Sequence, residues 1–420
     1  MSDNARDAGD PTIISTHVCI AGGGPAGMML GLLLARAGIE VVVLEKHKDF
    51  FRDFRGDTIH PSTLDLIDQL GLRTQFDAAG PNTLASLDMV IKGLRVTPID
   101  FSLLRHGNDR LALMPQWDFL DVLSAAASTL PTFTLMMGAE ANGLLRDGER
   151  VAGVVATTPD GPVTIEAALT VAADGRSSTL RAASGLSVSE TGVPIDVLWF
   201  RLPKPAINPP DTLAYITDAS MLITIPRGAG QDSGYYQTAM LIRKDSFDDV
   251  KAAGLDDFRA TIVRAAPFLE PVVGAIADWE DVKLLAVQIN RLSRWYLPGF
   301  LAIGDAAHAM SPAFGVGINY AVQDAVATAN LLLEPLRAGS PSVADLARVQ
   351  RRRARPARRM QALQLRVHNL VARPGAGASL PSPRVLRIVF TVAVPLLRHL
   401  TARLIGRGFR PERIRPEILG

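Results

Sequence analysis

The chain has 420 residues, a formal net charge of +2 and one cysteine, with 48% hydrophobic and 20% charged residues. This composition is typical of a folded protein of about two domains with a substantial core, and it excludes an intrinsically disordered chain. The small net charge does not favour a nucleic-acid partner. The lone Cys19 excludes an internal disulfide and a cysteine-rich metal site, and it fits a reducing compartment.

The N-terminal part begins with a predicted βαβ unit. Residues 12–20 are rich in Ile and Val and predict a buried strand, 25–37 predict a helix, and 40–44 predict a second buried strand. Strands that are apolar throughout indicate a parallel sheet with both faces covered. A short helix is predicted over residues 62–69, ending before a glycine.

The next part of the chain predicts mostly strands. Hydrophobicity alternates over residues 84–104, as in half-buried strands, and residues 117–128 predict an amphipathic helix. Residues 151–155 and 163–171 predict a hairpin through the turn Thr158-Pro159-Asp160-Gly161.

A separate sheet is predicted in the second half of the chain. Residues from about 190 to 285 are richer in proline and β-type residues, for example 197–202 and 221–226. Residues 300–303 then predict a buried strand and 317–333 a long helix. We interpret the first of these regions as an inserted sheet domain.

A glycine pattern, G-x-G-x-x-G, follows the first predicted strand. Gly22 permits a tight turn, Gly24 lets the backbone approach a pyrophosphate, and Gly27 lets helix and strand pack closely. The helix that starts near Pro25 and Ala26 offers free N–H groups and about half a positive elementary charge to a phosphate. The motif therefore predicts a dinucleotide cofactor, without distinguishing FAD from NAD.

An acidic residue closes the second strand of the same unit. Glu45 follows Gly22 by 23 residues, close to the separation at which an acidic side chain binds ribose hydroxyls. We assign Glu45 and the adjacent Lys46 to the predicted cofactor site.

A third region combines an apolar strand with small residues. Residues 301–308 read Leu-Ala-Ile-Gly-Asp-Ala-Ala-His, and Pro312, Gly315 and Gly317 follow with little side-chain bulk, so a flat ring could lie against the backbone. A helix beginning near Gly317 would direct its positive end at a ring that carries negative charge when reduced.

The stretch from 301 to 324 resembles the flavin-ribityl segment of the single-component FAD-dependent aromatic hydroxylases, the group of p-hydroxybenzoate hydroxylase. The resemblance implies FAD, with Gly304 and Asp305 at the ribityl chain and with Pro312 and Gly315 beside the reactive edge of the ring. It also implies that a backbone turn presents N–H groups to the pyrimidine end of the ring; its residues are Gly315, Val316, Gly317, Ile318 and Asn319.

A third motif and two weaker matches accompany this segment. Asp174, in an Asp-Gly pair after the strand 168–171, resembles the family's motif that contacts FAD and the reduced nicotinamide, although Asp-Gly is also a common turn. Arg55 resembles an arginine that approaches the flavin, and Gln116 a residue that binds the FAD diphosphate or ribityl chain; surface positions are the alternatives. The resemblance covers about residues 12–350.

These observations predict an α/β fold with a Rossmann-like FAD-binding domain, an inserted, mostly antiparallel β-sheet substrate domain and a helical C-terminal extension. The predicted boundaries are 12–75, 105–184 and 286–350 for the first, 76–104 and 185–285 for the second, and 351–420 for the third.

The resemblance implies an NAD(P)H-dependent monooxygenase. NADH or NADPH would reduce the flavin, O2 would add at flavin C4a, and one oxygen atom would pass to a small aromatic or otherwise electron-rich hydrophobic substrate. No residue is assigned as acid or base, and no substrate contact is assigned within 185–285. A flavin reductase or dehydrogenase for a quinone-like or polyprenyl lipid, and a flavin-binding redox module without turnover, remain as alternatives.

Other features limit the function further. The seven histidines are scattered without metal spacing, so no metal site is predicted, and His308 is interpreted as structural. No signal peptide pattern and no apolar run of about 20 residues is present, so we expect a cytoplasmic protein.

The C-terminal part leaves alternatives open. Residues 348–366 carry eight arginines, which we interpret as a solvated helix face paired with acids of the same chain; a phosphate-rich partner or an anionic membrane is the alternative. Residues 384–407 would pack on the substrate domain, form a homodimer contact or rest peripherally on a membrane.

Overall fold

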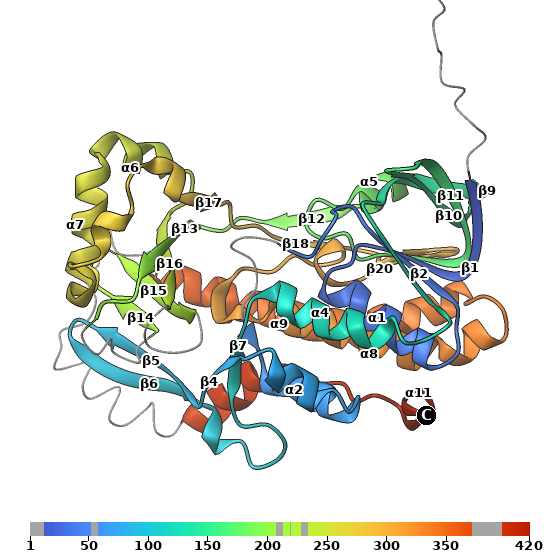
Figure 1. Ribbon diagram of the computed structural model, residues 1–420, viewed down its shortest axis with the longest axis horizontal. Coiled ribbons are helices and arrows are strands. Elements are labelled where there is room, and N and C mark those ends of the chain that lie inside the picture. Colours follow the sequence, from blue (N-terminus) through green and yellow to red (C-terminus); the bar gives the residue numbers. More distant parts are fainter. Residues whose placement is uncertain (1–11, 52–57, 207–212, 219, 228–233, 372–396) are drawn as a thin grey trace, which may run out of the picture.

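The chain forms two lobes joined by a narrow ribbon of two strands (Figure 1). The computed structural model describes residues 12–51, 58–206, 213–218, 220–227, 234–371 and 397–420. The connecting ribbon consists of β12 (Val188–Thr191) and β18 (Ile289–Leu292), which pair antiparallel.

The first lobe is built on an eight-stranded sheet of order β19-β20-β11-β1-β2-β8, which β10 and β9 extend from β11. The strands are β1 (Thr12–Ala21), β2 (Val41–Glu45), β8 (Phe133–Met137), β9 (Glu140–Asp147), β10 (Arg150–Thr158), β11 (Gly161–Ala172), β19 (Tyr296–Leu297) and β20 (Phe300–Ala302). β1 pairs in parallel with both β2 and β11, and β20 joins β11 in parallel. The predicted βαβ unit and parallel sheet are therefore confirmed.

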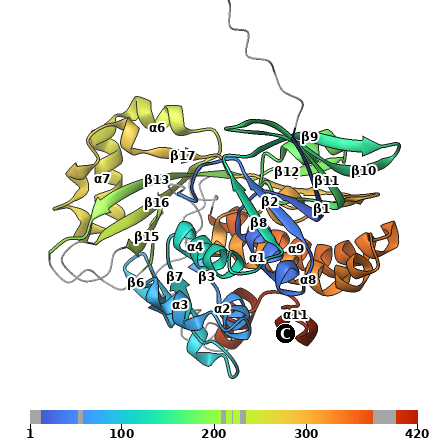
Figure 2. The same cartoon turned by 45° about the vertical axis from the view of Figure 1, so that its right-hand side comes forward.

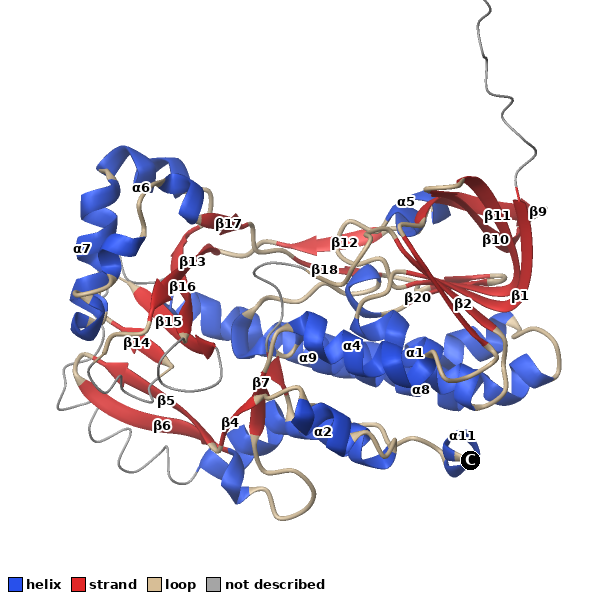
Figure 3. Cartoon of the chain, in the orientation of Figure 1, coloured by secondary structure: helices blue, strands red, loops and turns tan. Residues whose placement is uncertain are grey.

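Two helices lie against this sheet, as Figure 3 shows. They are α1 (Pro25–Arg36) and α8 (Gly317–Arg337), and both contribute to the main buried cluster together with β1 and β2. The prediction of a buried strand holds only for the C-terminal part of β1, where Val18 and Ile20 are fully buried, as is Val43 of β2. Residues 12–17 of β1 are exposed or half-buried, so the burial predicted for them is wrong. The predicted hairpin is confirmed, since Thr158 of β10 pairs with Gly161 of β11.

The second lobe is a seven-stranded sheet of order β17-β13-β16-β15-β14-β5-β6, antiparallel except between β14 and β5. The strands are β5 (Ser86–Ile91), β6 (Leu94–Asp100), β13 (Ile195–Pro203), β14 (Ala214–Ile216), β15 (Met221–Arg227), β16 (Tyr235–Arg243) and β17 (Lys283–Leu285). Helices α6 (Phe247–Ala253) and α7 (Leu255–Ala265) were not predicted. Phe258 and Ile262 of α7 cover one face of the sheet.

Shorter elements complete the two lobes. A three-stranded sheet consists of β3 (Thr58–Ile59), β4 (Asn82–Leu84) and β7 (Leu111–Leu113). The short helices are α2 (Pro61–Gln69), α3 (Arg73–Ala78), α4 (Gln116–Ala127) and α5 (Thr179–Ser184). Single 3-10 turns include η1 (Phe101–Leu103), η2 (Pro267–Leu269), η3 (Val273–Ala275), η4 (Trp279–Asp281), η5 (Gly304–Ala306) and η6 (Ala313–Gly315).

The described residues of the C-terminal part are largely helical, as predicted, and their first helix packs against both lobes. Helix α9 (Val343–Val371) is continuous across the predicted boundary at residue 350, and it lies alongside α8 in both views (Figure 2). Residues 397–406 are helical, and the chain ends in α11 (Pro416–Leu419). Residues 384–396 of the segment considered for membrane or dimer contact lie outside the described residues. Among the described residues, no helix is both long and apolar enough to cross a membrane.

Candidate active site

The glycine loop between β1 and α1 has the shape that its three glycines predict. Gly22 has a φ of +108°, and a Cβ there would lie 2.4 Å from the carbonyl oxygen of Ala173. A Cβ at Gly27 would lie 1.9 Å from the carbonyl oxygen of Gly22. At Gly24, by contrast, no atom lies within 4 Å of a Cβ. Gly22 and Gly27 therefore permit the close backbone contacts of this loop, while Gly24 leaves the backbone open to an approaching group.

Glu45 lies at the end of β2, directly beside this loop. It is 8% exposed, and its Oε2 accepts a hydrogen bond of 3.1 Å from the backbone N–H of Gly23. The other oxygen accepts from the N–H of His47 at 3.0 Å. The predicted spacing thus brings the carboxylate to the glycine loop. Lys46 is exposed at the same strand end.

Gln116 and Arg55 are two further predicted cofactor contacts. Gln116 is half-buried at the first position of α4. Arg55 lies outside the described residues, so its predicted approach to the flavin has no structural counterpart here.

Asp174 stabilises the start of α5, whose N-cap is Ser178. Its carboxylate accepts hydrogen bonds from the Ser178 hydroxyl and from the backbone N–H of Leu180, the latter at 3.1 Å, where α5 begins. Burial raises the pKa of this carboxyl, although these hydrogen bonds act in the opposite direction. The Asp-Gly pair thus organises a turn through its side chain, and only the neighbouring Gly175 is open, with no atom within 4 Å of a Cβ.

An arginine that was not predicted connects this turn to the late motif. Arg176 Nε donates to Asp305 Oδ2 at 3.0 Å, and Arg176 Nη2 donates to the carbonyl oxygen of Met310 at 3.2 Å. Both members of the pair are about one-third exposed, so the ion pair faces an accessible space. Two motifs separated by about 130 residues in sequence therefore meet at Asp305.

The loop before α8 adopts left-handed backbone at two consecutive residues. Phe314 has φ +65° and Gly315 has φ +62°. The carbonyl oxygen of Gly315 accepts a hydrogen bond of 2.6 Å from Thr58 Oγ1 and lies 3.2 Å from His60 Nε2. A Cβ at Gly315 would lie 2.1 Å from Thr58 Oγ1, so only glycine fits. Burial lowers the pKa of His60 to about 4, which keeps its ring neutral at neutral pH.

The side chain of Asn319 anchors the start of α8. Its Oδ1 accepts hydrogen bonds of 2.7 Å from the hydroxyls of Ser62 and Thr63, at the first turn of α2. The first turn of α8, with Val316, Gly317 and Ile318, is thereby fixed to α2, and its backbone N–H groups remain available.

Helix α9 holds the same loop from the other side, which sequence reasoning missed. Gln364 Nε2 donates to the carbonyl oxygens of Ser311 and Ala313 at 2.9 Å each. Gln361 Nε2 donates to the carbonyl oxygen of Ala309 at 3.0 Å, and His368 Nε2 lies 2.5 Å from Ser311 Oγ. The residues on α9 are spaced three and four apart, so they share one helix face. They fix the backbone on both sides of Pro312.

A buried charge network lies behind the motif. His308 Nε2 lies 2.6 Å from Asp324 Oδ2, and Arg353 Nε donates to Asp324 Oδ1 at 2.9 Å. Asp324 Oδ2 also accepts from the N–H of Gly304 at 3.1 Å. Burial alone would raise the pKa of Asp324, but His308 and Arg353 outweigh it and hold this pKa below the ordinary value. The structural interpretation of His308 agrees with these contacts.

This network should make the stability of the protein depend on pH in the acidic range. A carboxyl with a depressed folded pKa contributes stability above its unfolded pKa and loses that contribution as the pH falls through the folded value. We therefore expect the free energy of unfolding to fall below about pH 4, near the unfolded value of an aspartate. Urea denaturation at pH 3 to 7 measures this, and Asp324→Asn should flatten the profile. An equally steep profile in that variant would show that other carboxyls cause the loss.

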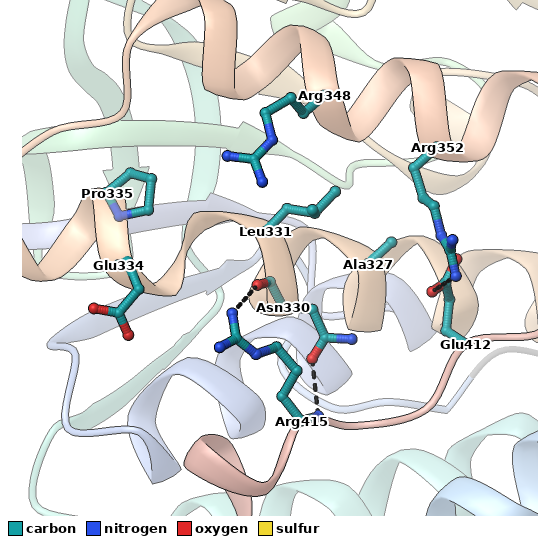
Figure 4. Close-up of a pocket in the computed structure, with 9 residues that line it drawn as sticks. All are labelled: Ala327, Asn330, Leu331, Glu334, Pro335, Arg348, Arg352, Glu412 and Arg415. Carbon is teal, nitrogen blue, oxygen red and sulfur yellow. Dashed lines mark hydrogen bonds and ion pairs between the residues drawn. The ribbon is translucent and has the colours of Figure 1, made fainter.

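A cavity of about 390 Å³ lies elsewhere, between α8, α9 and the C-terminal tail (Figure 4). Its lining includes Ala327, which is ten residues along α8 from Gly317, or about 15 Å at the rise of a helix. Arg352 and Arg415 in its wall are engaged with Glu412 and with Asn330 and Glu417, respectively. The position and the paired charges separate this cavity from the glycine and Asp305 motifs.

The residues present fit FAD. No atom lies within 4 Å of a Cβ at Gly24, Gly175 or Gly317, so the backbone is open at the starts of α1 and α8 and at the turn before α5. Arg176 Nη1 is buried and has no hydrogen-bond partner among the described residues, which leaves one donor beside Asp305. The chain thus offers open backbone at two helix N-termini and a polar group between them, as an extended dinucleotide requires.

Removing the hydroxyl of Thr58 should weaken FAD binding. Thr58→Val deletes one of the contacts to the Gly315 carbonyl oxygen, worth about 0.5–1.5 kcal/mol. Because this bond fixes the turn that would face the ring, we expect the Kd for FAD to rise about two- to tenfold. Fluorescence titration of the apoprotein measures it. Thr129→Val, which deletes an exposed hydroxyl bonded to the Ala126 carbonyl oxygen, should leave the Kd unchanged; an equal rise in both variants would refute the role of Thr58.

Comparisons with known proteins agree with these features. Residues 15–362 match the family model described as "FAD binding domain". The chain is 29% identical over 412 residues to 6-methylpretetramide 4-monooxygenase of Streptomyces rimosus, covering 96% of this chain and 95% of the relative. It is also 29% identical to an anhydrotetracycline monooxygenase of the same organism over 74% of this chain, but this covers only 61% of that relative.

The fold is shared with solved structures. OxyS anhydrotetracycline hydroxylase from Streptomyces rimosus superposes with a TM-score of 0.71 at 23% identity, covering 94% of this chain and 76% of the other. The names of the two Streptomyces rimosus monooxygenases found by sequence favour oxygenation over the lipid reductase and the redox module without turnover.

Proposed function

The chain belongs to the FAD binding domain family and is an FAD-dependent aromatic monooxygenase, and on that premise we propose that it hydroxylates a fused-ring aromatic compound with NADH or NADPH as electron donor. Bound FAD would supply the electron transfer and oxygen activation, while the protein supplies binding, orientation and exclusion of water. The relative matched over 95% of its length is a 6-methylpretetramide 4-monooxygenase, which supports a multi-ring substrate.

One observation carries the proposal: the loop before α8 faces an apolar cluster that also includes residues of the second sheet. Met310 and Val316 of this loop are buried in the cluster with Leu113 and Met360. Side chains that are only partly buried surround it; they are Leu84, Leu87, Ile225, Phe314 and Leu363. Apolar walls from several elements suit a large, flat hydrophobic ring system.

We assign the cofactor contacts accordingly. The backbone of Gly22, Gly24, Pro25, Ala26 and Gly27 would hold the pyrophosphate, and Glu45 the ribose. Gly304 and Asp305, with Arg176, would hold the ribityl chain. Gly315 to Asn319 would present backbone N–H groups to the ring, and Pro312 would shape its reactive side. Asp174 would act indirectly, by holding the turn that carries Gly175 and Arg176.

The test is product labelling. Purified holoenzyme is mixed with NADH or NADPH, a panel of hydroxylated naphthalenes, anthrones and anthraquinones, and ¹⁸O2. We expect substrate-stimulated NAD(P)H oxidation and a product heavier by one ¹⁸O atom. Stimulated oxidation that yields a product without the label would overturn the proposal and restore the reductase alternative.

A further inference from the structure

Two buried N–H donors in the second sheet have no hydrogen-bond partner among the described residues. They are Nε1 of Trp199 on β13 and Nε2 of Gln237 on β16. A buried donor without a partner costs about 1–3 kcal/mol, so such groups are rare in folded proteins and require an explanation. A bound molecule with oxygen acceptors would remove this cost.

The two donors lie on the same face of the sheet. In the pairing of β13 with β16, Trp199 is opposite Ala239 and Arg201 is opposite Gln237. Because residues two apart on a strand share a face, Trp199 and Gln237 are diagonal neighbours on adjacent strands. The other face is the one that α7 covers. A single molecule on the face away from α7 could therefore meet both donors.

A third residue fixes the orientation of the glutamine amide. Arg227 Nη2 donates to Gln237 Oε1 at 3.3 Å, so the amide oxygen is engaged and the amide nitrogen is the group left to donate. Arg227 is 3% exposed, and burial lowers its pKa to about 10, so it remains positively charged at neutral pH. The donor pair thus lies beside a buried positive charge.

The same face borders the loop before α8. Ile225 lies opposite Gln237 in the pairing of β15 with β16, and it packs against the cluster that contains Met310 and Val316. Trp199 packs in a cluster with Leu365 of α9, the helix that holds this loop and reaches the sheet in Figure 1. The donors therefore lie at the polar end of the apolar space assigned to the ring system.

We propose that Gln237 and Trp199, with Gln237 oriented by Arg227, bind two oxygen atoms on one edge of a polyoxygenated aromatic substrate and favour its phenolate or enolate form. This inference rests on the proposed function, because it assigns the substrate class of the same site. Trp199 Nε1 and Gln237 Nε2 can donate hydrogen bonds but cannot accept them, so they select oxygen acceptors. The neighbouring guanidinium of Arg227 favours a negatively charged oxygen.

The arrangement has a chemical consequence. A phenolate ring is richer in electrons than the neutral phenol and reacts more readily with an electrophilic oxygen. Donors that hold the negative oxygen at a fixed place therefore orient the ring and maintain its reactive form, without themselves taking a proton. They are specificity-determining residues for the hydroxylation.

The test measures binding to oxidised holoenzyme, without NAD(P)H. The probes are 1,8-dihydroxyanthraquinone, which carries three oxygens on one edge, and anthraquinone, which lacks the hydroxyls; the change in the flavin absorption spectrum reports binding. The variants are Trp199→Phe, Gln237→Leu and Gln237→Glu. Thr238→Val is the matched control, because its hydroxyl is also buried without a partner but lies on the opposite face of the same strand.

Wild-type enzyme should bind the dihydroxy probe at least about tenfold more tightly than anthraquinone. Trp199→Phe and Gln237→Leu should each reduce this preference about five- to tenfold, through the lost bond to an anionic oxygen. Gln237→Glu should reduce it further, because an acceptor replaces the donor, and Thr238→Val should preserve it. Equal losses for both probes, or no preference in the wild type, would overturn the assignment.

The outcomes separate this inference from the proposed function. Because the probes are measured without reduction or turnover, an enzyme that discriminates between them but releases no labelled product would retain the donor pair and lose the monooxygenase proposal for this substrate class. Labelled product from an enzyme that binds both probes equally would retain the monooxygenase proposal and overturn the assignment of the donor pair.

Discussion

Arg353→Met should lower the free energy of unfolding by about 3–5 kcal/mol. Arg353 is 1% exposed and lies between Asp324, which is fully buried, and Glu412, which is 4% exposed at its side chain. Methionine preserves much of the apolar contact but leaves both carboxylates without their shared cation. Asp324 then retains only His308, and Glu412 only Arg352, as a cationic partner. Removing one partner of a buried pair costs far more than the whole pair contributes to stability, because the remaining charge loses part of its compensation.

The loss should extend beyond the local contact. Arg353 Nη1 also donates to the carbonyl oxygen of Arg410 at 3.0 Å, so it connects α8, α9 and the C-terminal tail. Gly304 is held by the same Asp324, and we therefore expect weaker FAD binding together with the lower stability. Urea denaturation and FAD titration measure the two effects.

A matched control lies five residues earlier on the same helix. Arg348 is 52% exposed and pairs with Asp345 at 3.4 Å, so Arg348→Met should change the stability by less than about 1 kcal/mol. Adding Asp324→Asn to Arg353→Met should recover part of the loss, with a coupling of about 0.5–3 kcal/mol. A loss below 1 kcal/mol in Arg353→Met would mean that His308 and Arg352 suffice as partners of the two carboxylates, and it would contradict the role given to Arg353.

The arginine-rich stretch 348–366 shows what a local sequence pattern can predict and what it cannot. The charge pattern predicts a solvated helix face that pairs with acids; the pairing is confirmed, because Arg352 and Arg353 both contact Glu412, but the solvation is wrong for Arg353. It did not predict that Arg353 would be fully buried, since Glu412 lies 59 residues further on and reaches α9 only through the return of the tail. Local patterns hold no information about such partners.

In the candidate site, too, the local features were predictable from the sequence and the long-range contacts were not. The glycine loop was predictable because Gly22, Gly24 and Gly27 act within one strand-turn-helix unit. The clamp of Gln361 and Gln364 on the loop around Pro312 was not, because these side chains contact carbonyl oxygens about 50 residues away. Long-range contacts of this kind depend on helix packing, which no short motif encodes.

In the second sheet, one available signal was overlooked. Residues 255–265 place Phe258, Ile262 and Ala265 at helical spacing, with Asp256 and Asp257 in the first turn. This pattern is typical of an amphipathic helix with a favourable dipole. It was missed because the surrounding region was interpreted from its overall strand-like composition.

Gly24→Val should abolish tight FAD binding while leaving the apoprotein folded. Gly24 has φ −75° and ψ −175°, an extended conformation that valine adopts readily, and no atom lies within 4 Å of a Cβ there. The branched side chain would instead occupy the space through which a pyrophosphate approaches the N-terminus of α1. We expect the Kd for FAD to rise at least about a hundredfold, which corresponds to about 2.8 kcal/mol.

The other glycines of the motif provide the contrast that makes this experiment decisive. Gly22→Val would force a side chain onto left-handed backbone, with its Cβ 2.4 Å from the Ala173 carbonyl oxygen, so both the stability and FAD binding should fall. Gly192→Val, at an exposed residue that also has no atom within 4 Å of a Cβ, should alter neither. Thermal unfolding of the apoproteins and fluorescence titration with FAD measure the two quantities separately. If Gly24→Val retained the wild-type affinity for FAD, the dinucleotide would not approach the start of α1. The assignment of the remaining cofactor contacts, which depends on that position of the pyrophosphate, would then be wrong as well.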